Sequence, residues 1–240
     1  MTISRQTFLR LSGLSLAAVA FRRIARAVTG PKWGMAIDLA KCAGQDNCTQ
    51  CAAACRQAHN VPQIPDSRHE IHWIWKEPFN RALPNQADEY STISSAPVMV
   101  MCNHCEHPPC VRVCPTQATF QREDGIVAMD YHRCIGCRYC MAACPYGSRS
   151  FNWQDPRPYI ASPNPDFPTR TKGVVEKCNF CSERISTGRL PACVEACPEK
   201  ALTFGNLNDP NSAIRQLLGS RRHIRRKPEL GTGPKVFYIV

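Results

Sequence analysis

Short apolar runs recur along the chain, and each stands a few residues before a group of cysteines. These runs are residues 35–37, 98–101, 126–129 and 174–175. Runs of this length, bounded by polar residues and turn formers, predict short strands. The pattern of apolar and polar positions therefore predicts small strands that alternate with cysteine-containing turns and short helices.

Three further segments extend this pattern. Residues 119–122 and 126–130 flank the turn Glu123-Asp124-Gly125 and predict a β-hairpin, and residues 201–204 predict a closing strand. Trp73 and Trp75 alternate with other residues, which fits a half-buried strand; a loop that faces a partner protein is the alternative. Residues 57–97 and 151–172 are long and contain proline, so we expect them to be connecting loops at the surface.

Residues 1–27 have the composition of an export signal, with five arginines and no acidic residue. The apolar stretch at 11–21 is too short to span a bilayer, and Ala25-Arg26-Ala27 resembles a cleavage site. The sequence SRQTFLR at 4–10 resembles a twin-arginine signal in which Gln6 replaces the second arginine. The segment is removed on export, retained as an anchor that lies on the membrane, or folded as an N-terminal helix.

Cysteine is the residue that most needs an explanation, because the 240 residues include sixteen of it. Disulfides, zinc sites and iron–sulfur clusters are the three accounts. The cysteines form four groups of four, each with its last two members four residues apart. The groups are Cys42-x5-Cys48-x2-Cys51-x3-Cys55, Cys102-x2-Cys105-x4-Cys110-x3-Cys114, Cys134-x2-Cys137-x2-Cys140-x3-Cys144 and Cys178-x2-Cys181-x11-Cys193-x3-Cys197.

The spacing favours iron–sulfur clusters. The third group is the bacterial ferredoxin run C-x2-C-x2-C-x3-C-P, and proline also follows Cys114 and Cys197. Zinc leaves this rhythm unexplained, and cysteines two or three residues apart rarely form good disulfides with one another. A separation of four residues is one helical turn, so a short helix between two clusters can give one cysteine to each. In two-cluster ferredoxins the fourth cysteine of each run ligates the other cluster.

The formal net charge of +11 suggests a nucleic-acid partner at first sight. A [4Fe–4S] cluster with four thiolates carries a formal charge of about −2, so four clusters bring the total to roughly +3. The arginines of residues 1–27 account for the rest of the positive charge. We therefore expect no nucleic-acid partner; a zinc-rich nucleic-acid-binding module is the alternative of a different class, which metal analysis separates from an iron–sulfur protein.

Three motifs point to a family: CNHCEHPPC at 102–110, CIGCRYC at 134–140 and PACVEACP at 191–198. They resemble the four-cluster iron–sulfur subunits of membrane oxidoreductases, such as those of polysulfide, dimethyl sulfoxide and nitrite reductase systems. Within the family, the chain resembles the exported iron–sulfur subunit of the sulfite-reduction-associated Dsr membrane complex. Its own export signal, the five-residue gap after Cys42 and HWIWKE at 72–77 carry that finer resemblance. Group one departs from the family pattern, with Arg56 where the other groups have proline.

The resemblance implies an α+β fold of two interleaved bacterial-ferredoxin-like modules with long irregular loops. Module A would comprise residues 28–56 and 173–208, module B would be inserted at 98–150, and 209–240 would form a C-terminal tail. It also implies four [4Fe–4S] clusters with exchanged ligands. Their ligands would be Cys42, Cys48, Cys51 and Cys197 for cluster 1; Cys55, Cys178, Cys181 and Cys193 for cluster 2; Cys102, Cys105, Cys110 and Cys144 for cluster 3; and Cys114, Cys134, Cys137 and Cys140 for cluster 4.

Several residues near the cysteines have two interpretations. Five cations flank ligands and either raise cluster potentials or are solvated surface charges: Arg112, Arg133, Arg138, Lys177 and Arg184. His104 and His107 stand between ligands of group two, and we expect both to be loop residues. The sequence contains no glycine-rich phosphate loop, paired-carboxylate site or hydrolase triad, so we expect an electron-transfer subunit without a catalytic residue.

The resemblance implies an exported complex of sulfur-compound respiration that reacts with a quinone on the periplasmic face of the cytoplasmic membrane. The implied partners are an integral-membrane quinone-interacting subunit and a multihaem c-type cytochrome. The alternative places the same chain beside the molybdopterin catalytic subunit of a polysulfide or tetrathionate reductase, or in a nitrite reductase system.

Overall fold

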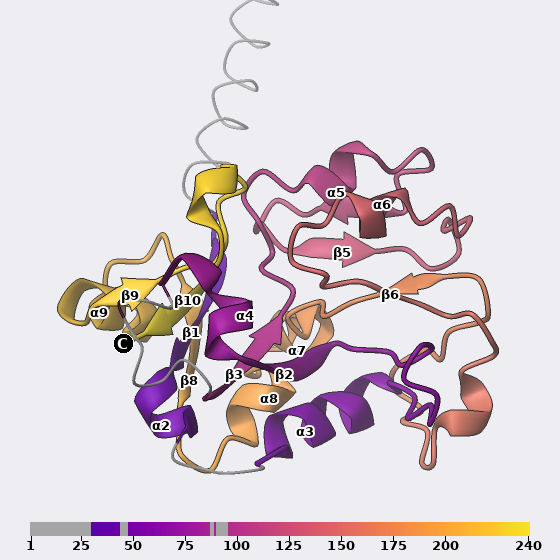
Figure 1. Ribbon diagram of the computed structural model, residues 1–240, viewed down its shortest axis with the longest axis horizontal. Coiled ribbons are helices and arrows are strands. Elements are labelled where there is room, and N and C mark those ends of the chain that lie inside the picture. Colours follow the sequence, from indigo (N-terminus) through magenta and orange to yellow (C-terminus); the bar gives the residue numbers. More distant parts are fainter. Residues whose placement is uncertain (1–29, 44–47, 87–88, 90–95) are drawn as a thin grey trace, which may run out of the picture.

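A four-stranded sheet joins the two ends of the described chain, which comprises residues 30–43, 48–86, 89 and 96–240 of the computed structural model. The strand order is β8 (Leu202–Asn206), β1 (Trp33–Asp38), β10 (Val236–Ile239) and β9 (His223–Ile224). β1 and β10 are parallel, whereas β8 and β9 pair antiparallel with their neighbours (Figure 1). The predicted export segment at 1–27 lies outside the described residues.

Three antiparallel strand pairs complete the sheets of the described residues. They are β2 (Ile74–Pro78) with β3 (Pro97–Met101), β4 (Thr119–Gln121) with β5 (Val127–Met129), and β6 (Ser150–Phe151) with β7 (Val175–Glu176). Each apolar run named above contributes to a strand. The hairpin predicted around Gly125 is confirmed, and Trp75 lies half-buried in β2.

The helices are short, and most of them lie beside cysteines. They are α2 (Leu39–Ala43), α3 (Gln50–His59), α4 (Phe79–Ala82), α5 (Pro109–Arg112), α6 (Tyr139–Ala142), α7 (Ser182–Ser186), α8 (Ala192–Glu195) and α9 (Ala213–Ser220). Single 3-10 turns are η1 (Pro84–Gln86), η3 (Arg157–Tyr159) and η4 (Pro228–Leu230). In the described part of the chain, no helix has the length and apolar character to cross a bilayer.

Two helix pairs bring together parts of the chain that are distant in sequence. α3 contacts α8, and α5 contacts α6. In Figure 1, α5, α6 and β5 lie together on one side of the molecule, and α3, α7 and α8 lie together on another. Helices and small sheets in this mixture give the α+β fold that the sequence predicts, with groups one and four on one helix pair and groups two and three on the other.

The described part of residues 57–97 is not the surface loop that the sequence suggested. Trp73 is 2 % exposed, and Phe79 and Leu83 are also buried in the main core. The indole N–H of Trp73 donates to Glu176 Oε2 at 3.0 Å, and the guanidinium of Arg170 lies 2.7 Å from the same oxygen. A large ring with a buried hydrogen-bond partner belongs to a core. Through these contacts with Glu176, the two long connections hold the regions around the cysteines together.

The C-terminal residues are an integral part of the fold and not a tail. β10 lies between β1 and β9, and Tyr238 is fully buried with its hydroxyl donating to the Met99 carbonyl at 3.2 Å. α9 begins at the capping residue Ser212, whose side chain accepts from the Arg215 N–H. The end of the chain therefore supports the sheet that carries the first cysteine group.

Candidate metal centres

Each cysteine group uses a short helix to present its third member. Cys51, Cys110, Cys140 and Cys193 lie in α3, α5, α6 and α8, respectively. In three groups the helix ends before the fourth cysteine, and a proline follows that cysteine. In group one Arg56 replaces the proline, and α3 continues through Cys55 to His59. The local sequence thus determines how far each helix runs past the ligands.

The closely spaced cysteines lie in tight turns with the same backbone conformation. The residue before the second cysteine has a positive φ in three groups: 42° at His104, 69° at Gly136 and 55° at Phe180. At Gly136 a Cβ atom would also lie 2.4 Å from the Gly173 carbonyl oxygen, so this position requires glycine. A turn of this kind can direct backbone N–H groups toward bound anions.

Backbone N–H groups already point at several cysteine sulfurs. Thr119 donates to Cys114 Sγ at 3.4 Å, and Ala201 donates to Cys197 Sγ at 3.3 Å. In group four, the N–H groups of Phe180 and Ala192 each lie 3.4 Å from a sulfur. Such donors stabilise a thiolate over a thiol. All sixteen cysteines lie in described residues and none forms a disulfide, so every sulfur can bind metal.

Cysteine set 1 lines one pocket and consists of Cys42, Cys48, Cys51 and Cys197. Three of these come from group one, and the fourth is the last cysteine of group four. Burial raises the pKa of the Cys42 thiol, the charge of Lys76 lowers it, and nearby Cys197 and Cys48 raise it. The four sulfurs are therefore close enough to repel one another once ionised.

Cysteine set 4 lines another pocket and consists of Cys114, Cys134, Cys137 and Cys140. Here three members come from group three, and Cys114 is the last cysteine of group two. Burial raises the pKa of Cys140, Arg149 lowers it, and the charges of Cys134 and Cys114 raise it. This pocket, like the first, therefore combines three cysteines of one group with the last cysteine of another.

The other two sets are more deeply buried. Set 2 consists of Cys55, Cys178, Cys181 and Cys193, and set 3 consists of Cys102, Cys105, Cys110 and Cys144. Burial raises the pKa of Cys55 strongly, and the charges of Cys178, Cys193 and Cys181 follow as further causes. For Cys105, burial again comes first, followed by Cys102, while a hydrogen bond from Thr232 lowers the pKa and Cys110 and Cys144 raise it.

Cysteines of one set also shift the pKa values of cysteines in a neighbouring set. These effects show which sets lie next to each other. After burial and the charges of its own set, Cys51 of set 1 raises the pKa of Cys193 in set 2. After burial, Cys102 of set 3 is the leading cause that raises the pKa of Cys178 in set 2. Arg149 lies close to both Cys110 of set 3 and Cys140 of set 4. The sets therefore follow one another in the order 1, 2, 3, 4.

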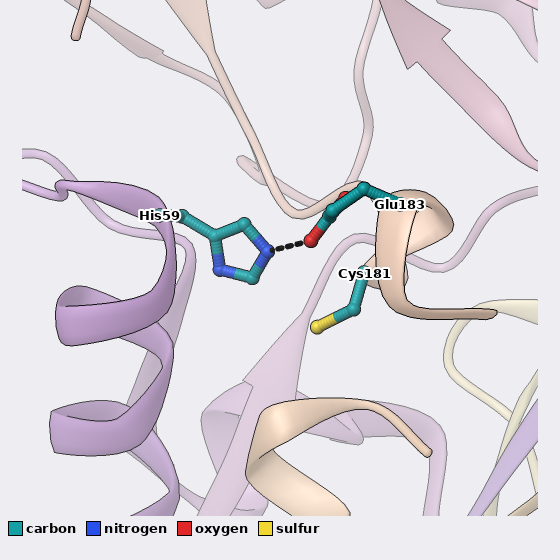
Figure 2. Close-up of side chains that lie close together, drawn as sticks. All are labelled: His59, Cys181 and Glu183. Atoms are coloured by element: carbon teal, nitrogen blue, oxygen red, sulfur yellow. Dashed lines mark hydrogen bonds and ion pairs between the residues drawn. The ribbon is translucent and has the colours of Figure 1, made fainter. Parts of the chain in front are cut away.

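A histidine and a carboxylate support the second set. His59 in α3 lies 2.8 Å from Glu183 Oε1 in α7 through its Nε2 atom, and both face Cys181 (Figure 2). Burial disfavours the charged imidazole, but hydrogen bonds to Cys181 and Glu183 outweigh it and raise the pKa of His59 to about 9. Because Cys181 also lies with three other cysteines, we interpret the histidine and glutamate as supports of set 2 and not as a separate metal site.

The cations and histidines near the cysteines differ from one another in burial. Arg112, Arg133 and Arg138 are exposed, and Arg184 pairs with Glu195. Lys177 is 1 % exposed, and its Nζ donates to the carbonyls of Val127 and Cys178. His107 is exposed as expected for a loop residue, whereas His104 is fully buried and stacks on Phe180 with ring centroids 3.8 Å apart. The expectation of a loop residue therefore missed the burial of His104, which belongs to the core between sets 2 and 3.

Sequence reasoning missed the buried arginine that lies closest to the cysteines of two groups. Arg149 is 5 % exposed, and its principal charged neighbours are Cys110, Cys140 and Cys102. It follows Cys144 by five residues in a polar segment, so its sequence context gave no sign of burial. Its proximity to two groups emerges only when the helices α5 and α6 are placed together.

Comparison with known proteins supports iron–sulfur chemistry. A family model described as a 4Fe-4S dicluster domain matches residues 96–157 and 163–207. The chain is 43 % identical to the Hdr-like menaquinol oxidoreductase iron-sulfur subunit 1 of Archaeoglobus fulgidus, over 86 % of this chain and 82 % of the relative. It is 37 % identical to the arsenate respiratory reductase iron-sulfur subunit of Shewanella sp. (strain ANA-3), over 86 % and 95 % of the two chains.

A third relative is the menaquinone reductase, iron-sulfur cluster-binding subunit, of Nitratidesulfovibrio vulgaris. It is 38 % identical, over 87 % of this chain and 88 % of its own length. Sixteen free cysteines, the N–H donors at their sulfurs and these matches fit one kind of cofactor, and the chain carries four [4Fe–4S] clusters. When bound, such clusters supply one-electron oxidation and reduction.

Proposed function

Because this chain belongs to the family of four-cluster iron–sulfur electron-transfer subunits of membrane oxidoreductases, we propose that it carries electrons between a quinone-reactive membrane subunit and a second redox partner. It is an electron-transfer subunit, and substrate chemistry belongs to other subunits of the complex. The observation that carries the proposal is the succession of four cysteine sets from one pocket to another. A row of centres of this kind has two ends, one for each partner.

The proposed ligands of each cluster are the members of one cysteine set. The contact of α3 with α8 supports the exchange of Cys55 and Cys197 between groups one and four. The contact of α5 with α6 supports the exchange of Cys114 and Cys144 between groups two and three. Each helix then gives its third cysteine to one cluster, and the fourth cysteine, one turn later, reaches the neighbouring cluster.

The proposed modules follow from these exchanges. Module A comprises residues 28–56 and 173–208 and holds clusters 1 and 2; module B is inserted at 98–150 and holds clusters 3 and 4. Residues 57–97 and 151–172 connect the modules, and residues 209–240 complete the sheet of module A through β10. The buried contacts of Trp73 and Arg170 with Glu176 support a fixed relation between the modules.

The row of clusters ends at two different surfaces. At set 1, Lys41 and Lys76 line the pocket. At set 4, Ile135 and Tyr139 are 67 % and 63 % exposed beside Cys134 and Cys140. Exposed apolar side chains beside a terminal redox centre suit a lasting contact with a partner subunit, so we assign the set 4 end to the integral-membrane partner.

The proposed complex is exported and lies on the periplasmic face of the cytoplasmic membrane. The basic and apolar composition of residues 1–27 motivates this location. Two relatives named for menaquinol or menaquinone support a quinone partner. The finer resemblance to the Dsr iron–sulfur subunit suggests sulfur-compound respiration with a multihaem cytochrome as the second partner. The relative named for an arsenate respiratory reductase favours the second candidate, in which the partner is the molybdopterin catalytic subunit of a reductase.

Affinity purification of the tagged chain from anaerobic membranes tests the proposal. We expect an integral-membrane protein to co-purify, and we expect a reduced short-chain menaquinone analogue to bleach the visible absorption of the clusters. Molybdenum in the complex would select the reductase candidate, and covalently bound haem would select the cytochrome candidate. A complex without an integral-membrane protein, or clusters that no quinol reduces and no quinone oxidises, would refute the proposed quinone link.

A further inference from the structure

Arg149 has unusual surroundings for an arginine. Its side chain is buried next to β6, and its Nη1 atom donates to Thr119 Oγ1 at 3.0 Å and to Met129 Sδ at 3.3 Å. These two partners lie on the paired strands β4 and β5. The second terminal nitrogen, Nη2, is also buried and has no hydrogen-bond partner within the described residues. One end of the guanidinium is therefore fixed by hydrogen bonds, and the other makes none with the described residues.

Burial of an arginine without an anionic partner is strongly unfavourable. The anions that Arg149 has are cysteine thiolates. Its principal charged neighbours are Cys110, Cys140 and Cys102. Thr119 and Met129, which hold Nη1, line the pocket of cysteine set 4. Cys110 and Cys140 pack in one buried cluster, with Met129 against it. The cation therefore lies where a cysteine of group two and a cysteine of group three meet.

We propose that Arg149 is a positioning residue for electron transfer, a single buried cation shared by the two clusters of module B that raises the reduction potential of both. The proposal rests on the presence of clusters at groups two and three. It does not depend on the exchange of Cys114 and Cys144, because Cys110 and Cys140 belong to different clusters under either assignment.

The shared position has a defined electrostatic consequence. Reduction adds one negative charge to a cluster, and a nearby fixed cation favours that state. When an electron passes from one cluster of the pair to the other, the total charge around Arg149 stays the same and no proton is needed. Arg149 therefore favours both reduced states and leaves the direction of transfer between the two clusters to other groups.

Other cations near the clusters provide a comparison. Arg112 lies in α5, two residues after Cys110 and two before Cys114, but its side chain is exposed. Water and salt screen an exposed charge far more than a buried one. Removal of Arg112 takes away the same charge close in sequence to Cys110, so Arg112→Gln is the matched control for Arg149→Gln.

The test is a potentiometric titration of the anaerobic holo-protein, followed by electron paramagnetic resonance, for Arg149→Gln, Arg149→Lys and Arg112→Gln. For Arg149→Gln we expect two of the four clusters to become harder to reduce. At a fixed potential their ratio of reduced to oxidised protein should fall about tenfold, which is 59 mV for a one-electron couple. The other two clusters should keep their potentials. Arg149→Lys should retain most of the effect, and Arg112→Gln should change the ratio much less.

Four results would overturn the proposal: no shift in Arg149→Gln, an equal shift of all four clusters, a shift in Arg149→Lys as large as in Arg149→Gln, or an Arg112→Gln shift as large as that of Arg149→Gln. If Arg149→Gln fails to bind its full iron, Arg149→Lys decides the question. Full iron and unchanged potentials in that variant support a charge effect, and lowered potentials contradict it. Iron analysis of the unaltered chain tests the presence of the clusters separately, so failure of the proposed function would be recognised by itself.

Discussion

Replacement of Cys114 by alanine separates the exchanged ligand sets from a simple assignment by sequence group. Cys114 lies with Cys134, Cys137 and Cys140 in one pocket. Burial works against the ionised form of Cys114, but hydrogen bonds from the N–H of Thr119 and from Thr116 outweigh it and lower its pKa. These hydrogen bonds favour the thiolate form, which is the form that binds metal. Its loss should damage cluster 4 and leave cluster 3 with four ligands.

The size of the effect follows from the structure. Four complete clusters contain about sixteen iron atoms, and loss of one cluster leaves about twelve. The alanine leaves the Thr119 N–H without its sulfur acceptor, which costs roughly 1–3 kcal/mol. That is less than the stability of a typical domain, about 5–15 kcal/mol, so the remainder of the fold should persist. The iron content should therefore fall by one cluster or less.

Double replacements show which cluster has lost its ligand. Under the exchanged assignment, Cys114 and Cys137 serve the same cluster, so the double alanine variant should lose no more iron than the single ones, about four atoms. Cys114 and Cys105 serve different clusters, so that double variant should lose about eight. Iron and sulfide analysis of anaerobically purified protein measures both. The opposite pattern, with additive loss for Cys114 with Cys137, would refute the two-module account.

Three further predictions concern folding and location. Gly136→Ala should lower the iron content of the protein because the new Cβ would collide with the Gly173 carbonyl. Gly147 has a φ of 64° and open space around it, so Gly147→Ala should leave the iron content unchanged. Trp73→Ala should destabilise the protein by about 3–5 kcal/mol in chemical denaturation, whereas the half-buried Trp75→Ala should cost less. Protease added to intact spheroplasts should digest the chain; complete protection, with the cytoplasm verified as sealed, would contradict export.

The elements that the sequence predicted well are those that local residues determine. The strands before the cysteines, the hairpin around Gly125 and the short helices with the third cysteines follow from runs of a few residues. The iron–sulfur cofactor was also predictable, because the x2, x2, x3 spacing of group three is itself a local pattern. The family comparison agrees with that prediction.

The features that sequence reasoning missed depend on contacts between distant residues. β10 pairs with β1 across almost the whole described chain, and no local pattern in residues 209–240 indicated this partner. Glu176 accepts a hydrogen bond from Trp73 and pairs with Arg170, so one side chain of each long connection is buried in the core. Arg149 had no sequence signal because its surroundings are created by the contact of α5 with α6.

The central claim is that neighbouring cysteine groups exchange their last ligands, and the location of iron in crystals tests it most directly. Anomalous diffraction at the iron edge from anaerobically grown crystals of the holo-protein would locate each iron relative to its sulfurs. We predict that the iron nearest Cys114 belongs to the cluster held by Cys134, Cys137 and Cys140. If that iron belongs instead to the cluster held by Cys102, Cys105 and Cys110, the exchange of ligands and the two modules built on it are wrong.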